Sequence, residues 1–292
     1  MTRRTYAYKA VGGNEILADV YRVGRRRSPV IVWLHGGALM MGHRGNLAES
    51  QAQEYLAAGY RVVAIDYRLA PETKLPAIIE DLQDAFRWVQ AIGPELFGAD
   101  PGRIGVVGGS AGGYLALMAG CCVQPRPRAL VSFYGYGDII GAWYSKPDPG
   151  YCRQPLVSRE EALASVGQPG ISGTPGPNER WRCYLYCRQQ GLWPREVMGA
   201  DPEAEPERFW PFCPERQVSG DYPPTLLLHG DQDTDVPYAR SVDMAAALAR
   251  AGVEHELVTI PGGGHGFDGA GDEAAKAARR KVLEFLGKHL AG

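Results

Sequence analysis

The chain has 292 residues, of which 45% are hydrophobic and 22% are charged, and its formal net charge is −2. These proportions are those of a globular protein, and the near-zero charge excludes the positive field that gathers nucleic acid. The one basic run, residues 25–27, is short and is expected to form a solvated turn between two strands. No stretch approaches the about 18 consecutive apolar residues of a membrane-spanning helix, so no membrane span is expected.

Apolar periodicity predicts strands that alternate with helices along most of the chain. Residues 29–34 are continuously apolar, which favours a strand covered on both faces, as in a mostly parallel sheet. This alternation predicts an α/β protein with a doubly wound sheet and right-handed crossovers. The expected strands cover residues 15–21 (antiparallel), 29–34, 60–66, 103–108, 129–134, 224–229 and 254–260. The expected helices cover residues 47–58, 77–91, 112–121, 241–251 and 274–290, and residues 100–102 are expected to form a turn.

The regular alternation stops over residues 138–220, which are rich in proline and in aromatic residues. The segment has too many large apolar groups for a disordered linker and is too long for a bare loop. We therefore expect an inserted lid of short helices here, within one α/β domain formed by residues 1–137 and 221–292. Trp181 and Trp210 are expected either to line a pocket or, as the favoured alternative, to form the lid's own core.

The N-terminal residues lack the apolar core of a signal peptide. A cytoplasmic location is therefore expected, with an export signal already removed as the alternative. Cys121 and Cys122 lie in a predicted apolar helix and are expected in the core. The other four cysteines fall in the irregular region: Cys152, Cys183, Cys187 and Cys213. They lack the paired spacing of a zinc site, so no metal or cofactor is expected, and a disulfide among them is the less favoured alternative.

The strongest chemical signal is Gly-Gly-Ser-Ala-Gly at residues 108–112, a G-x-S-x-G motif between a predicted strand and a small-residue helix. This is the context of a nucleophile elbow, in which a sharp turn exposes the serine hydroxyl above the sheet. The alternative of a phosphate-binding loop fails because no Lys-Ser or Lys-Thr pair follows the glycines. The motif predicts that Ser110 is a nucleophile in an α/β-hydrolase fold.

A serine hydroxyl needs a base, and the base needs an acid that orients it. Among the six histidines, His265 is favoured because glycines surround it just after the last predicted strand. Asp233 is the favoured acid, because it follows an earlier strand and gives the chain order serine, acid, histidine. We expect the neighbouring Asp231 and Asp235 to hold the loop through hydrogen bonds from their side chains to the backbone.

The oxyanion of a tetrahedral intermediate needs backbone N–H donors. Residues 35–38, His-Gly-Gly-Ala, follow the early buried strand, where glycines let the backbone approach a substrate. Together with residues 66–72 (DYRLAPE) and 109–113 (GSAGG), this motif resembles those of the hormone-sensitive-lipase-like esterases. The resemblance implies that Gly36, Gly37 and Ala111 supply the oxyanion donors and that Asp66 and Arg68 brace the loops of the site.

Three features depart from that family. The oxyanion loop lacks a third glycine, Gly109 stands where an aspartate is common, and the lid is an insertion at residues 138–220 instead of an N-terminal cap. The lid arrangement is more similar to xylan and feruloyl esterases, dienelactone hydrolases and prolyl-oligopeptidase-like peptidases. The chain is thus expected to be a serine carboxylesterase acting on small or medium acyl esters, without a cofactor. An acylaminoacyl-type peptidase and a dienelactone-hydrolase-like enzyme are the alternatives, and the oligomeric state stays open, with a homodimer as one alternative.

Overall fold

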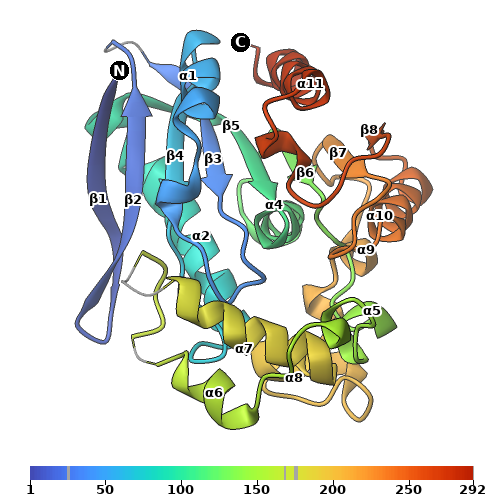
Figure 1. The fold of residues 1–292 in the computed structure, drawn as a ribbon. Coiled ribbons are helices and arrows are strands. Elements are labelled where there is room, and N and C mark those ends of the chain that lie inside the picture. Colours follow the sequence, from blue (N-terminus) through green and yellow to red (C-terminus); the bar gives the residue numbers. More distant parts are fainter. Residues whose placement is uncertain (25–26, 168, 174–176, 292) are drawn as a thin grey trace.

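The computed structural model describes residues 1–24, 27–167, 169–173 and 177–291. Its centre is one eight-stranded sheet in the order β1-β2-β4-β3-β5-β6-β7-β8 (Figure 1). β1 and β2 pair antiparallel, as do β2 and β4, and the remaining neighbours are parallel. The strands are β1 (Thr2–Val11), β2 (Asn14–Arg22), β3 (Ser28–Leu34), β4 (Arg61–Ile65), β5 (Ala99–Gly109), β6 (Ala129–Phe133), β7 (Thr225–Gly230) and β8 (His255–Ile260). The predicted mostly parallel α/β sheet is confirmed.

Helices cover both faces of this sheet, which is why its central strands are continuously apolar. Along β3, Val30, Val32 and Leu34 face one core cluster, and Ile31 and Trp33 face the other. The first cluster is closed by α2 (Leu75–Ala91), α4 (Ala111–Cys122) and α10 (Ala239–Arg250). The second is closed by α1 (Glu49–Ala57) and α11 (Glu273–Leu290). The short α3 (Gly93–Phe97) follows α2 directly.

Residues between β6 and β7 form a group of short helices beyond the carboxyl ends of the parallel strands (Figure 1). These are α5 (Ala142–Ser145), α6 (Arg159–Ala164), α7 (Pro177–Gln190), α8 (Trp193–Met198) and α9 (Pro214–Gln217). Trp193 of α8 is fully buried, and its ring stacks on Tyr144 of α5 with a centroid distance of 4.0 Å. Trp210, by contrast, is 43% exposed, so the expectation that it belongs to the core of this segment is wrong.

Two elements differ from the sequence prediction. β1 was not predicted, because its residues are mostly exposed and the apolar pattern is weak. A two-residue turn at Gly12 and Gly13, both with positive φ, joins it to β2, and a Gly-Gly pair is a recognised hairpin signal. The predicted turn at residues 100–102 is wrong, since β5 already begins at Ala99, with a register shift against β3.

The remaining expectations have mixed outcomes. All six cysteines are free, so the disulfide alternative is wrong. Cys121 and Cys122 are half-buried at the edge of the core and not inside it. The first two residues of the basic run 25–27 lie outside the described residues. Within the described part of the chain, no helix has the length and apolar character needed to cross a bilayer.

Candidate active site

Ser110 lies at the sharp turn between β5 and α4. Its backbone has φ 57° and ψ −124°, which is strained for a residue that carries a side chain. The turn is closed by backbone contacts on both sides. A Cβ at Gly108 would lie 2.2 Å from the carbonyl oxygen of Gly112, and one at Gly112 would lie 2.1 Å from that of Leu34. The glycines of the motif are therefore required by close packing around this turn.

His265 and Asp233 come together because they follow the adjacent parallel strands β8 and β7. The two side chains share a hydrogen bond of 2.8 Å between Nδ1 of His265 and Oδ2 of Asp233. The Asp233 carboxylate is fully buried, and its Oδ1 accepts the N–H groups of Asp235 and Val236 at 2.8 and 2.9 Å. Burial raises the pKa of Asp233, but the hydrogen bonds from His229 and His265 outweigh it and hold the pKa below its usual range.

His229 supports the Asp233 carboxylate from the other side, a role that sequence reasoning did not assign. Its Nδ1 lies 2.7 Å from the hydroxyl of Ser241 and accepts from it in the tautomer with the proton on Nε2. That Nε2–H lies 3.0 Å from the carbonyl oxygen of Val236 and 3.2 Å from Oδ2 of Asp233. The signal available in the sequence was the position of His229, the penultimate residue of the strand that leads into the aspartate loop.

Residues 35–38, the predicted oxyanion loop, pass directly over Ser110. A Cβ at Gly36 would lie 2.9 Å from the carbonyl oxygen of Gly109 and 3.2 Å from Cβ of Ser110, so only glycine fits. Gly37 has φ +109°, and its carbonyl oxygen accepts the N–H groups of Met40 and Met41 at 2.9 Å each. No acceptor for the N–H group of Gly36 or Gly37 occurs among the described residues. The backbone of this loop therefore has donors to offer to a ligand.

His35 supports this loop from below. It is fully buried, and its ring stacks on Tyr67 with a centroid distance of 4.1 Å. Its Nδ1–H donates to the carbonyl oxygen of Gly36 at 2.8 Å, and Tyr67 Oη donates to the carbonyl oxygen of His35 at 2.9 Å. Burial lowers the pKa of His35 to about 3, so the imidazole is neutral at pH 7.

The two residues expected to brace the site contact loops and helices around it. Asp66 accepts the backbone N–H of Arg44 at 2.8 Å and pairs with the Arg44 side chain. The Arg68 side chain donates two hydrogen bonds to Asp81 of α2, at 2.8 and 2.7 Å, and its backbone N–H donates a third at 3.0 Å. Neither Asp66 nor Arg68 lines the cavity described next.

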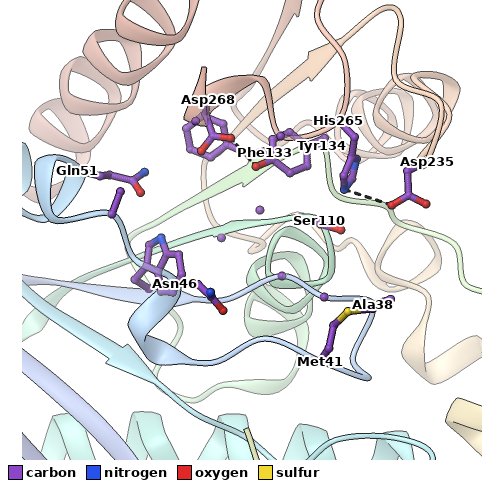
Figure 2. Close-up of a pocket in the computed structure, with 18 of the residues that line it drawn as sticks. Ala38, Met41, Asn46, Gln51, Ser110, Phe133, Tyr134, Asp235, His265 and Asp268 are labelled. Atoms are coloured by element: carbon purple, nitrogen blue, oxygen red, sulfur yellow. Dashed lines mark hydrogen bonds and ion pairs between the residues drawn. The ribbon is translucent and has the colours of Figure 1, made fainter. Parts of the chain in front are cut away.

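Ser110, His265, Gly36 and Gly37 line one cavity of about 510 Å³ (Figure 2). Asp233 lies behind His265, and Ala111 begins α4, where a first-turn N–H has no partner within the helix. The cavity has aromatic walls and a few charged groups. Its aromatic and charged residues are Trp33, Phe133, Tyr134, Trp181, Tyr184, Asp235, Asp268 and Arg279. Trp181 thus lines the cavity, and Trp210 does not.

The nitrogen of His265 that faces away from Asp233 has a partner that sequence reasoning missed. Nε2 lies 3.5 Å from Oδ2 of Asp235 (Figure 2). No hydrogen bond joins Nε2 to Ser110 Oγ among the described residues, and such bonds are often long without substrate.

Asp231 and Asp235 were expected to hold the loop through hydrogen bonds to the backbone. For Asp231 this holds, since its Oδ1 accepts the N–H of Gly262 at 2.8 Å. For Asp235 it is wrong, because its carboxylate contacts side chains and not the backbone of its own loop.

Comparison with solved structures decides the fold. A protein of unknown function from Staphylococcus aureus aligns with a TM-score of 0.80 and 23% identity over 98% of this chain and 99% of its own. The esterase LipW of Mycobacterium marinum aligns with a TM-score of 0.71 and 21% identity, covering 100% and 82%. A Thermogutta terrifontis esterase 2 structure gives 0.68 and 24%, covering 98% and 93%. The chain has the α/β-hydrolase fold. The expected resemblance to esterases is thereby confirmed at the level of the fold.

Family models match two parts of this α/β-hydrolase, and the second match includes the later helices of the short-helix segment. Residues 19–137 match the BD-FAE family, and residues 177–292 match the prolyl oligopeptidase family. With the α/β-hydrolase fold, these matches indicate a serine hydrolase. Curated relatives include the non-reducing polyketide synthases Preu6 of Preussia isomera and stbA of Stachybotrys bisbyi, 29% and 30% identical over 97% and 90% of this chain. The α/β-hydrolase spans only 14% of the length of either synthase.

Proposed function

We propose that this α/β-hydrolase cleaves small or medium acyl esters through an acyl-enzyme on Ser110. The observation that carries the proposal is the 2.8 Å hydrogen bond between His265 and Asp233 beside a serine held in a strained turn. Strain of this kind persists where the surrounding structure over-determines it, which is typical of functional sites. The oriented imidazole supplies the base that a serine hydroxyl lacks.

In the first half-reaction, Ser110 Oγ attacks the ester carbonyl carbon as its proton passes to Nε2 of His265. Asp233 keeps the proton of the imidazole on Nδ1 and stabilises the imidazolium that forms. The N–H groups of Gly36, Gly37 and Ala111 are the proposed donors to the oxyanion. The tetrahedral intermediate then collapses, the C–O bond to the alcohol breaks, and the alcohol leaves with the proton from Nε2.

In the second half-reaction, Nε2 takes a proton from water, and the hydroxide attacks the acyl carbon. Collapse of this intermediate breaks the bond to Ser110 Oγ, which recovers its proton from His265. The acid leaves, and the free enzyme is restored. We further propose that residues 138–220 form a cap on the domain of residues 1–137 and 221–292, because the cap residues Trp181 and Tyr184 line the cavity.

A panel of substrates tests the reaction. We expect turnover of p-nitrophenyl acetate and longer p-nitrophenyl esters, compared side by side with acetylated xylan fragments, methyl ferulate and aminoacyl anilides. The Ser110→Ala variant should lose ester turnover while its circular dichroism spectrum and melting temperature match those of the parent. A burst of p-nitrophenol retained in Ser110→Ala would refute the proposal, and a preference for anilides would favour the peptidase alternative.

A second candidate is hydrolysis of acyl thioesters. It is favoured by the match of nearly the whole chain to part of the polyketide synthases, because polyketides are acyl chains. The same serine chemistry accepts a thioester, since only the leaving group differs. A kcat/KM for acyl N-acetylcysteamine thioesters well above that for the oxygen esters of the same acids would favour this candidate.

A further inference from the structure

A second carboxylate faces His265 on the side opposite Asp233. Oδ2 of Asp233 holds Nδ1 at 2.8 Å, and Oδ2 of Asp235 lies 3.5 Å from Nε2 (Figure 2). Nε2 is the nitrogen that must accept the proton of Ser110 in the proposed reaction. The imidazole therefore lies between two carboxylates. The second carboxylate, that of Asp235, is beside Nε2, the nitrogen that the proposed reaction pairs with Ser110.

The carboxylate of Asp235 is fixed by residues of the proposed cap. Its Oδ1 accepts hydrogen bonds from Tyr151 Oη at 2.8 Å, Tyr184 Oη at 2.6 Å and Arg188 Nη1 at 2.6 Å. Arg188 has only 1% of its side chain exposed and forms a second ion pair with Asp148 at 2.8 Å. Three donors on one oxygen leave Oδ2 free to face the imidazole. The position of this charge is thus set by the cap and not by the aspartate loop alone.

We propose that Asp235 is a positioning residue that couples the cap to the base. With the cap in place, its carboxylate holds Nε2 of His265 and competes with Ser110 for that nitrogen. The inference rests on the proposed function, because it assigns Nε2 as the atom that accepts the proton of the nucleophile. A negative charge at this distance favours the protonated imidazole, so the base becomes competent only at higher pH.

Other titratable groups face the same imidazole and have to be separated from this effect. Tyr134 lies against the ring with a centroid distance of 4.6 Å, and it donates to Asp268. Burial and the charge of Asp268 hold the pKa of Tyr134 well above its usual value, so its phenol is neutral. For His265, burial lowers the pKa, but the hydrogen bond that its Nδ1–H donates to Asp233 and the charges of Asp235, Asp233 and Asp268 outweigh burial and raise it. Of the three carboxylates, only Asp235 lies beside Nε2.

Titration of His265 by nuclear magnetic resonance tests the coupling directly. The full chain is labelled with ¹⁵N and carries Ser110→Ala. Its imidazole signals are titrated with and without the additional change Asp235→Asn. A His265→Gln variant identifies which signals belong to His265. We expect Asp235→Asn to lower the pKa of His265 by about half a unit to one unit, since the site is partly open to solvent. The matched control is Asp231→Asn in the same loop, which should leave the titration unchanged. An unaltered His265 titration in Asp235→Asn would overturn the proposal.

A second variant separates the electrostatic effect from loss of structure. Tyr151→Phe removes one donor from Oδ1 of Asp235 and keeps the aromatic ring, so the carboxylate becomes less neutralised. We expect the pKa of His265 to rise by a few tenths of a unit, opposite in direction to Asp235→Asn. If the pKa of His265 moved in the same direction in both variants, the cause would be disturbed packing, and the proposal would be overturned. This comparison remains decisive even if Asp235→Asn folds poorly.

The pH profile of kcat/KM for p-nitrophenyl acetate gives the functional readout. In Asp235→Asn with Ser110 intact, the acid limb should move to lower pH by the same half unit to one unit, with several-fold higher kcat/KM at pH 5.5. If the parent chain hydrolyses no ester, the proposed function fails, and the titration still decides whether Asp235 acts on His265. If it hydrolyses esters and neither the limb nor the titration moves, this inference alone fails.

Discussion

The phenol ring of Tyr134 fills the space in which a side chain at Gly109 would lie. A Cβ at Gly109 would be 2.9 Å from Oη of Tyr134 and 3.2 Å from two of its ring carbons. Tyr134 is itself held at φ 37° and donates a hydrogen bond to Asp268. This contact gives the departure from the lipase-like motif a physical reason, because an aspartate before Ser110 would displace the ring that packs on His265.

Gly109→Ala should therefore destabilise the protein by about 1–3 kcal/mol, the usual cost of overpacking. Urea unfolding measures the free energy, and ester turnover should fall because the Tyr134 ring next to His265 has to move. The control is Gly287→Ala on α11, where the nearest atom to a new Cβ is 3.9 Å away. That change should be neutral or stabilising. Equal stability of Gly109→Ala and the parent would contradict the packing argument.

Asp233→Asn should lower kcat for p-nitrophenyl acetate by about 10³- to 10⁴-fold, because an amide no longer fixes the tautomer of His265. The fold should persist, since the backbone N–H bonds to Oδ1 can be kept by the amide oxygen. Steady-state kinetics and a thermal melt measure the two quantities. A loss of less than tenfold would show that Asp233 is not the orienting acid.

The raised pKa of His265 predicts the pH dependence of the parent enzyme. The base must be neutral, so kcat/KM should fall as the pH drops, with a midpoint above the usual value of about 6.5. The contribution of His265 to the free energy of unfolding changes with pH in the opposite direction to kcat/KM. Because the folded pKa is raised, this histidine stabilises the fold fully below pH 6.5, and the contribution is lost as the pH rises through the folded pKa. A kinetic midpoint below pH 6 would be inconsistent with the two-carboxylate environment.

His35 should make the fold sensitive to acid. Its folded pKa is about 3, so between pH 6.5 and pH 3 the unfolded chain binds a proton that the folded chain does not. The free energy of unfolding should then fall by up to about 1.4 kcal/mol for each pH unit lost in this window. His35→Phe keeps a ring against Tyr67 without this titration. Urea unfolding at pH 7, 6 and 5 measures the free energy of unfolding of both proteins, and the difference between them should narrow as the pH falls. A difference that stays constant would refute the lowered pKa of His35.

Trp193 connects the short-helix segment to residues 35–38, the proposed oxyanion loop, since its Nε1–H donates to the carbonyl oxygen of Ala38 at 2.9 Å. Trp193→Phe keeps an aromatic core but leaves that buried carbonyl without its partner, at a cost of about 1–3 kcal/mol. We expect a lower kcat for ester hydrolysis together with a lower melting temperature. Trp210→Phe, on an exposed residue outside the cavity lining, is the matched control and should change neither quantity. Unchanged kinetics in Trp193→Phe would show that the loop holds its shape without the bond.

Much of the fold was predictable because the apolar pattern depends on local spacing. The continuous run of β3 and the one-sided face of α2 each follow from which faces of an element are buried. β1 was missed for the same reason, since a largely exposed edge strand leaves almost no apolar period to detect. The residues proposed for the triad were also named from sequence, because strand ends and glycine-flanked loops mark where side chains can reach one edge of a sheet.

By itself, the sequence determined a strand–turn–helix around Ser110 and placed a histidine and an aspartate after the last two strands. Only the tertiary structure decided what surrounds them: His229 behind Asp233, Tyr134 across Gly109, and Asp235 held by Arg188 against Nε2 of His265. The physical reason is the distance along the chain over which each kind of interaction acts. Helix and strand patterns are set by neighbours a few residues apart, whereas these contacts join segments that meet only when the sheet and the segment above it pack together.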